Sequence, residues 1–316
     1  MDEEAPVSDK VLNKLIETIS NGCGHLYRPI GLRRDADAQA YSVLKLAQAT
    51  TASEIQREQA LLEADQQRRS VMLEHEEELA RRSAKRRLHQ ELLKQENLER
   101  IFAQALENPP ESADEHSVDQ DWLTDFVERA QKISSQQMQA LWARILSLEV
   151  GSPGSFSVRA MDVLKSMTAA EANAFRKLCA VASKLGKGSA PVVLVNGRRK
   201  LRWFNALADI DFQDLELHRC GIPLTDQLAL QALGLIHAKE LCISDLPAAT
   251  VLDFDFYSKS LRVEVLKDKS TLAFINFTGV GAELYQLLDE EVNPDYVELL
   301  QDKLQKIAKV ELIDRP

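Results

Sequence analysis

Cysteine and histidine lie close together at two places in the sequence, and both residue types can bind a transition metal. The residues in question are Cys23 and His25, His218 and Cys220, and, further along the chain, His237 and Cys242. A structural zinc site normally needs four ligands in paired spacings such as Cys-x-x-Cys, and neither pair has such a spacing. We therefore predict no metal site and no cofactor.

The motifs that position a catalytic nucleophile or a nucleotide phosphate are absent from the sequence. It contains no Gly-x-Ser-x-Gly turn, and no cysteine lies in a recognisable reactive motif. Residues 151–155 read Gly-Ser-Pro-Gly-Ser, but they lack the Gly-Lys-Ser/Thr ending of a phosphate-binding loop. We predict a turn and a helix start there, assign no catalytic residue, and expect a protein that is not an enzyme.

Basic residues are concentrated in residues 172–208, which contain no Asp or Glu. Because Asn-Gly favours a two-residue turn, Asn196-Gly197 predicts a hairpin with strands at residues 192–195 and 200–204. Trp203 and Phe204 accompany the basic residues, as in many nucleic-acid surfaces. The candidate phosphate-binding residues are Arg198, Arg199, Lys200 and Arg202.

These positive charges have a second interpretation, in which they are paired inside the fold. Residues 209–256 follow directly in the chain, and most of their charged residues are acidic. The whole protein carries a formal net charge of −10, which repels nucleic acid at long range. We favour the internal pairing and keep nucleic acid as the alternative partner.

A very long helix, or two nearly continuous helices, is predicted for residues 32–108, which contain neither Gly nor Pro and are rich in helix-forming residues. Its apolar positions do not keep a heptad repeat. Between residues 74 and 91 the only large apolar side chains are Leu79 and Leu88. A stretch this polar must project into solvent, bridge domains or contact a partner.

The charges of this stretch are segregated into an acidic block followed by a basic block. Glu78 and Arg82 form an i,i+4 pair of the favourable order, worth about 0.2–0.5 kcal/mol, as expected for a solvated helix. Alternatively, an antiparallel second copy would set each acidic block against the other's basic block and form a homo-oligomer. The candidate self-association residues are Glu74, Glu77, Glu78, Arg81, Arg82 and Arg86.

Four short amphipathic helices are expected after Pro109-Pro110. Capping boxes are predicted at Ser134 with Gln137 and at Thr168 with Glu171, and single caps at Asp119 and at Ser155 or Ser157. Helices with short connections pack as a bundle, and the apolar face that includes Trp142 is predicted to form part of its core.

The last part of the chain mixes strands with helices. Strands are predicted at residues 251–257, 261–266 and 271–277, and helices around 212–217, 224–233, 280–288 and after Asn293-Pro294. This order is compatible with a winged-helix-like module. The predicted fold class is mainly α with a smaller α+β part. Its segments are an N-terminal amphipathic segment (1–31), a long charged helix (32–108), a helical bundle (112–186) and the winged-helix-like module (187–316).

Several motifs in the middle of the chain resemble a known family. They are Gln95-Glu-Asn97, Asp119-Gln-Asp-Trp122, Met138-Gln-Ala-Leu-Trp-Ala-Arg-Ile-Leu146 and Pro153-Gly-Ser-Phe-Ser157. Together they resemble a bacterial domain of unknown function that is distantly similar to the abortive-infection alpha proteins. The resemblance implies a bacterial protein connected with phage resistance, and it implies no catalytic residue, substrate or cofactor.

The sequence predicts a cytoplasmic protein without a membrane span. Residues 1–10 are acidic and unlike a secretory signal, and no window approaches the ~18 apolar residues that a spanning helix needs. The cysteines show no paired spacing, which is typical of free thiols in a reducing compartment. We expect a non-enzymatic scaffold or sensor that acts through protein contacts. The alternative is a nucleic-acid- or ribosome-associated binding protein.

Overall fold

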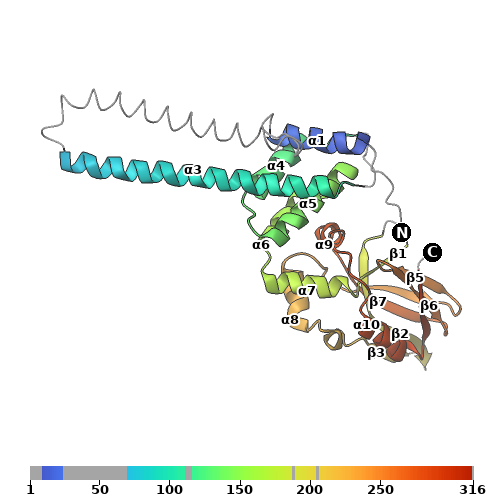
Figure 1. Ribbon diagram of the computed structural model, residues 1–316. Helices are drawn as coiled ribbons and strands as arrows, with labels where there is room; N and C mark the ends of the chain where they lie inside the picture. Colours follow the sequence, from blue (N-terminus) through green and yellow to red (C-terminus); the bar gives the residue numbers. More distant parts are fainter. Residues whose placement is uncertain (1–8, 24–69, 111–115, 187–188, 204–205, 315–316) are drawn as a thin grey trace. The chain divides into compact units, whose positions relative to one another are not determined.

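A computed structural model describes residues 9–23, 70–110, 116–186, 189–203 and 206–314 (Figure 1). The chain divides into two compact units, Met1–Ser155 and Phe156–Pro316. Of the long helix predicted for residues 32–108, the part before Ser70 lies outside the described residues, and the rest is helical up to Glu107.

The described part of the first unit is helical. Its helices are α1 (Asp9–Cys23), α3 (Ser70–Glu107), α4 (Gln120–Ala130) and α5 (Gln136–Gly151). The C-terminal part of α3 packs against α5, α4 and α1, and Ile101, Phe102 and Ala105 are buried there. Figure 1 shows that α3 continues as one straight helix well beyond α4 and α5.

An aromatic cluster forms the centre of this first unit. Trp122 stacks on Phe126 with ring centroids 5.3 Å apart, and Phe126 in turn contacts Trp142 at 5.4 Å. Trp142 has no solvent exposure, so its predicted place in the core is confirmed. Such ring pairs add to the burial of apolar surface because their edges and faces attract each other.

The helix caps show how far local sequence determined this unit. Asp119 caps α4 by accepting a hydrogen bond from the Trp122 amide at 2.9 Å, as predicted. The capping box predicted at Ser134 is wrong, because α5 begins at Gln136 and its N-cap Ser135 makes no side-chain cap bond. Instead, the buried Gln139 side chain donates a hydrogen bond to the Ile133 carbonyl at 2.9 Å, and this bond ties the helix to the preceding turn.

The second unit contains one antiparallel sheet with short helices. Its strands are β1 (Ser183–Leu185), β2 (Pro191–Trp203), β3 (Ala206–Asp214), β4 (Leu241–Leu246), β5 (Val251–Asp255), β6 (Lys259–Val265), β7 (Ser270–Asn276) and β8 (Ala308–Asp314). The strand order is β4-β7-β2-β1-β5-β6-β8, with β3 paired to β2. The α-helices are α6 (Val158–Ser166), α7 (Ala169–Cys179), α8 (Leu224–Ala232), α9 (Gly279–Tyr285) and α10 (Pro294–Leu304), and a 3-10 helix spans Leu217–Cys220.

The predicted winged-helix-like module is therefore wrong. The predicted strands at 251–257, 261–266 and 271–277 are present as β5, β6 and β7, but they belong to an eight-stranded sheet. The segment predicted as a helix around residues 212–217 contains the end of β3, whose pairing with β2 overrides its weak helical pattern. Strands β4 and β8 lie at the two ends of the strand order and were not predicted.

The hairpin turn predicted at Asn196-Gly197 is also wrong. Strand β2 runs through both residues, and β3 follows after residues 204 and 205. A Cβ atom at Gly197 would lie 2.4 Å from Ile307 Cδ1 and 2.6 Å from Leu304 Cδ2. The glycine therefore allows the end of α10 and the residues after it to approach the strand closely.

Helices α6 and α7 belong to the second unit, so the unit boundary falls inside the segment predicted as one bundle. The Glu283 carboxylate on α9 accepts hydrogen bonds from the Ser157 amide at 2.7 Å and the Ser157 hydroxyl at 2.8 Å. Ser157 is also the N-cap of α6, and Thr168 with Glu171 forms the predicted capping box of α7.

Candidate functional site

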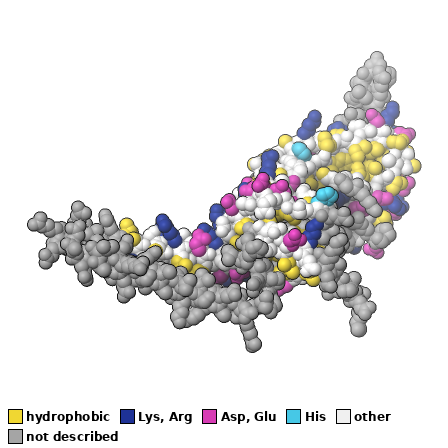
Figure 2. Space-filling model, turned by 90° about the horizontal axis from the view of Figure 1, so that it is seen from above, with side chains coloured by type: hydrophobic (Ala, Val, Ile, Leu, Met, Phe, Trp, Pro, Cys, Tyr) yellow, Lys and Arg dark blue, Asp and Glu magenta, His cyan; other side chains and the backbone are white. Residues whose placement is uncertain are grey.

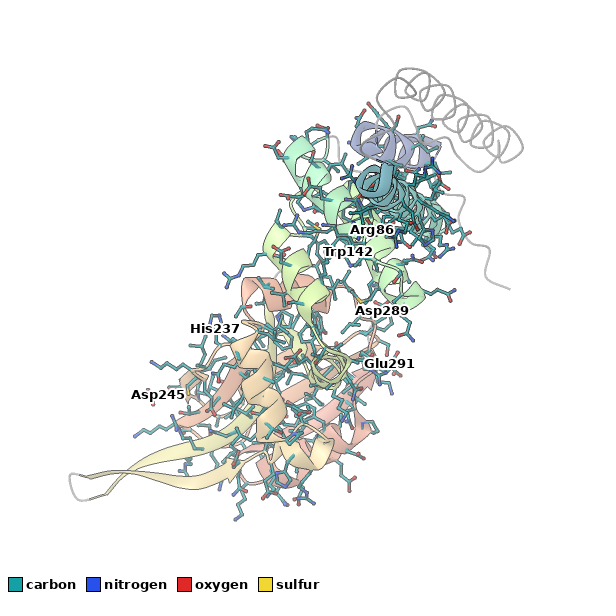
Figure 3. The ribbon with its side chains drawn as sticks, turned by 90° about the vertical axis from the view of Figure 1, so that its left-hand side faces the viewer. Arg86, Trp142, His237, Asp245, Asp289 and Glu291 are labelled. Carbon is teal, nitrogen blue, oxygen red and sulfur yellow. The ribbon has the colours of Figure 1, made fainter. Side chains whose placement is uncertain are left out.

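The part of α3 from Glu78 to Leu93 is not covered by any residue that the structure describes. From Glu78 to Leu93 every side chain is exposed except that of Ser83, which is half-buried. Figure 3 looks along this helix and shows its side chains radiating into the surroundings. An isolated helix with few apolar contacts is only marginally stable in water, so this segment gains stability when it contacts a partner. We refer to residues 78–93 as the α3 arm.

Four leucines on the α3 arm are exposed although they are large and apolar. They are Leu79 at 57%, and Leu88, Leu92 and Leu93 at 45% each. Leu88 and Leu92 lie one turn apart and so share a face of the helix. Burying a leucine that was exposed contributes about 1.5–3 kcal/mol.

The charges of the α3 arm are largely uncompensated. Arg82 Nε lies 3.8 Å from Glu78 Oε1, and both side chains are more than half exposed, so this pair contributes little to stability. Arg81 and Arg86 make no ion pair with any residue that the structure describes. Basic and acidic side chains are interspersed on the visible surface in Figure 2. The side chains of Glu74 and Glu77 lie outside the described part of the chain.

A rigid base connects the α3 arm to the helical body. The buried Asn97 side chain donates a hydrogen bond to the Gln131 carbonyl at 3.1 Å and accepts one from Gln139 at 3.2 Å. Phe102, one and a half turns further on, is almost completely buried. Because the helix is continuous, a partner held by the arm is held in a fixed orientation to the body of the first unit.

The two predicted phosphate-binding residues whose side chains the structure describes, Arg198 and Arg199, do not share one face of the sheet. Arg198 and Arg199 are neighbours on β2, opposite Thr271 and Ser270 of β7, so their side chains lie on opposite faces of the sheet. Arg198 Nη2 contacts Cys242 Sγ at 3.8 Å. The side chains of Lys200 and Arg202 are not among those the structure describes, and their backbones pair with Asp209 and Leu207 of β3.

The predicted pairing of these bases with residues 209–256 is not seen for Arg198 and Arg199, which make no ion pair with a described residue. Acids of that stretch have other partners. Glu216 lies 3.3 Å from Lys303, and the hydrogen bond from Lys303 lowers the pKa of Glu216. Asp253 binds Arg262 at 2.8 Å, and this bond lowers the pKa of Asp253.

Sequence reasoning missed a group of buried polar atoms at the base of the β2–β3 ribbon, which extends beyond the other strands in Figure 3. Four such atoms lack a hydrogen-bond partner: Asn196 Oδ1, Arg198 Nε, Arg199 Nε and Thr271 Oγ1. Buried polar atoms without partners are rare in folded proteins, and each needs an explanation. In the sequence, this group is visible only as polar residues within strands, and that pattern does not show that their polar atoms are buried.

The cysteine and histidine pairs do not converge. Among the described residues no group of three or more His, Cys, Asp or Glu side chains is arranged to hold a metal ion, and His25 and the Cys23 side chain lie outside them. A surface groove of about 280 Å³ is lined by Arg219, Asp295, Glu298, Leu299 and Asp302. Its carboxylates lie along α10 without a cysteine or histidine to complete a ligand set.

No helix in the described ranges combines the length and the apolar character needed to cross a bilayer. The sequence profile of a family described as "Protein of unknown function (DUF2806)" matches residues 81–301, which include most of the α3 arm, the helical body and most of the sheet unit. No curated protein and no solved structure matches the chain.

Proposed function

Because the chain belongs to the DUF2806 family of proteins of unknown function, which brings no activity with it, we propose a function from its own residues. The protein is a non-enzymatic scaffold or sensor that acts through protein–protein contacts. The observation that carries this proposal is the α3 arm, a continuous helix with exposed leucines that is fixed to a packed body.

A second copy of the chain is the partner that the arm fits best. The acidic block of α3 (Glu74, Glu77 and Glu78) precedes its basic block (Arg81, Arg82 and Arg86), so two antiparallel copies of α3 place opposite charges against each other. The ion pairs set the register and orientation, while the leucines provide most of the binding free energy. The proposed product is a homo-oligomer built on α3.

The proposed setting is the bacterial cytoplasm and the response to phage infection. It is supported by the resemblance of the motifs between residues 95 and 157 to a bacterial domain distantly similar to the abortive-infection alpha proteins.

Nucleic-acid binding receives less support from the geometry. Arg198 and Arg199 lie on opposite faces of the sheet, and Arg198 is engaged with Cys242. The net charge of −10 also repels nucleic acid at long range.

Replacing Leu79, Leu88, Leu92 and Leu93 with glutamine is expected to abolish self-association. Glutamine keeps the helix propensity of the arm but removes its apolar contact. If each leucine contributes about 1 kcal/mol or more to the interface, the dimer becomes at least about a hundredfold weaker. Light scattering at micromolar concentration should give the 35.5 kDa of one chain for this variant and a larger mass for the unaltered protein.

The matched control replaces two leucines that are equally exposed but lie in the other unit. Leu224 and Leu228 on α8 are exposed at 66% and 53%. The variant Leu224→Gln with Leu228→Gln should keep the mass of the unaltered protein. A monomeric unaltered protein, or an α3 variant that keeps its mass, would contradict the proposal.

A further inference from the structure

A cluster of polar side chains lies on one face of the sheet, where β4, β7 and β2 run side by side. In the strand register, Cys242 of β4 lies opposite Ala273 of β7, and Ala273 lies opposite Asn196 of β2. Arg198 lies opposite Thr271 in the next row on the same face. Residues that face each other across antiparallel strands project to the same side, so these side chains share one surface.

Two side chains of β2 reach across β7 toward β4. Arg198 Nη2 approaches Cys242 Sγ to 3.8 Å, and Asn196 Nδ2 donates a hydrogen bond to Glu240 Oε2 at 3.3 Å. The small Ala273 between them is completely buried. A guanidinium group is thus held at the sulfur atom of a cysteine whose own side chain is exposed.

Three polar atoms of the side chains on this face of the sheet lack hydrogen-bond partners. Thr271 has no solvent exposure and Asn196 only 7%, yet Thr271 Oγ1 and Asn196 Oδ1 make no hydrogen bond, nor does Arg198 Nε. Asn196 Oδ1 can accept a hydrogen bond, Arg198 Nε can donate one, and the Thr271 hydroxyl can do either. They are the partners that an oxygen atom added to Cys242 Sγ would need.

The other described cysteines are in a different environment. Cys179 and Cys220 are buried, and burial raises the pKa of both thiols, with a further contribution from Glu290 to Cys179 and from Asp295 to Cys220. Both therefore stay protonated and out of reach of reagents in solution. Cys242 is exposed and lies beside a cation, the setting in which reactive cysteines are found.

We propose that Cys242 is a site of oxidation by hydrogen peroxide, with Arg198 as the positioning residue and Asn196 and Thr271 as partners of the product. The Cys242 thiolate attacks one peroxide oxygen, the O–O bond breaks, and hydroxide leaves and takes a proton from solvent to give water. The sulfur loses two electrons, which reduce the peroxide, and becomes a sulfenic acid. Its hydroxyl donates to Asn196 Oδ1, and Thr271 Oγ1 donates to its oxygen.

This inference does not depend on self-association through α3, because it concerns the second unit alone. Its test treats the full-length protein with hydrogen peroxide, traps sulfenic acid with dimedone, and identifies the labelled cysteines by peptide mass spectrometry. Dimedone should label Cys242 and leave Cys179 and Cys220 unlabelled. Absence of label on Cys242, or equal labelling of all three, would overturn the proposal.

The role of Arg198 is tested with two variants. Arg198→Gln should slow the labelling of Cys242 about fivefold, the factor expected for two unit charges roughly 4 Å apart in water-like surroundings. Arg198→Lys keeps the charge and should restore most of the rate. An unchanged rate in Arg198→Gln would show that the guanidinium has no part in the reaction.

Labelling of Cys179 and Cys220 also reports whether a variant is folded. If Arg198→Gln makes Cys179 and Cys220 accessible to label, the role of Arg198 is tested instead by the salt dependence of Cys242 labelling in the unaltered protein. Salt at 1 M screens the guanidinium charge and should slow the reaction. A rate independent of salt would then overturn the proposal. Thr271→Val, which removes only a hydroxyl, should leave the initial rate unchanged and shorten the lifetime of the sulfenic acid, and an unchanged lifetime would remove Thr271 from the site.

Discussion

Replacing Trp142 with alanine is expected to lower the free energy of unfolding by about 3–5 kcal/mol, the usual cost of emptying a large buried aromatic site. Trp142 has no solvent exposure and packs against Phe126 with ring centroids 5.4 Å apart. Its Nε1 atom has no hydrogen-bond partner, so the loss is one of packing and not of a polar contact. Urea unfolding of the full chain, followed by tryptophan fluorescence and circular dichroism, measures the change.

Trp142→Phe provides the control for this prediction. Phenylalanine keeps an aromatic ring in the site and removes the buried N–H group that lacks a partner, so it should cost clearly less than alanine. If Trp142→Ala unfolds at the same urea concentration as the unaltered protein, the aromatic cluster is not the core of the first unit. Trp142 would then become a candidate contact residue.

Replacing Gly281 with alanine is expected to destabilise the second unit by about 3 kcal/mol, at the upper end of the usual cost of overpacking. A Cβ atom at Gly281 would lie only 2.0 Å from the Leu235 carbonyl oxygen, which belongs to the backbone and cannot rotate away. The start of α9 is held in this position because the Thr278 amide donates to the same carbonyl at 3.0 Å. The helix must therefore shift or lose this bond.

Gly279 offers a matched control on the same helix. A Cβ atom there would meet nothing within 4 Å, so Gly279→Ala should change the free energy of unfolding by less than about 1 kcal/mol, or increase it. Thermal unfolding of both variants gives the comparison. Equal losses at the two positions would mean that close packing against Leu235 is not the reason for the glycine.

Local chemistry in the sequence was enough to predict the ends of several helices. Asp119 and the pair Thr168 and Glu171 act within one turn of the chain, so their roles can be inferred without knowledge of the fold. The same holds for the α3 arm, because the scarcity of large apolar residues in it already excluded a buried helix. These features depend on neighbours in sequence and not on contacts between distant segments.

The pairing of the strands into one sheet, and the polar cluster on that sheet, depend on distant segments and were not predictable. Taken alone, glycine after asparagine indicates a tight turn. Here a glycine is needed at position 197 because α10, more than a hundred residues further along the chain, packs directly against it. Arg198 and Cys242 are separated by 44 positions, and nothing in either local sequence indicates that they meet. Strand pairing also placed Arg198 and Arg199 on opposite faces of the sheet, which the local sequence does not indicate.

The central claim, that two α3 arms pair in antiparallel orientation, can be tested by exchanging their charges. One variant changes the acidic block to lysine (Glu74→Lys, Glu77→Lys and Glu78→Lys), and the other changes the basic block to glutamate (Arg81→Glu, Arg82→Glu and Arg86→Glu). In an antiparallel pair, residues 74–78 of each chain lie against residues 81–86 of the other. When both chains carry the same variant, each of these two contacts joins like charges. In a mixed pair, both contacts again join opposite charges.

The decisive measurement is the mass in solution of each variant and of their equimolar mixture, obtained by light scattering at micromolar concentration. We expect each variant alone to have the 35.5 kDa of one chain and the mixture to have twice that mass, like the unaltered protein. Repulsion within one helix costs only about 0.2–0.5 kcal/mol for each like-charged i,i+4 pair, so both variants should remain helical. A mixture that stays at the mass of one chain, while the unaltered protein does not, would contradict antiparallel pairing of α3.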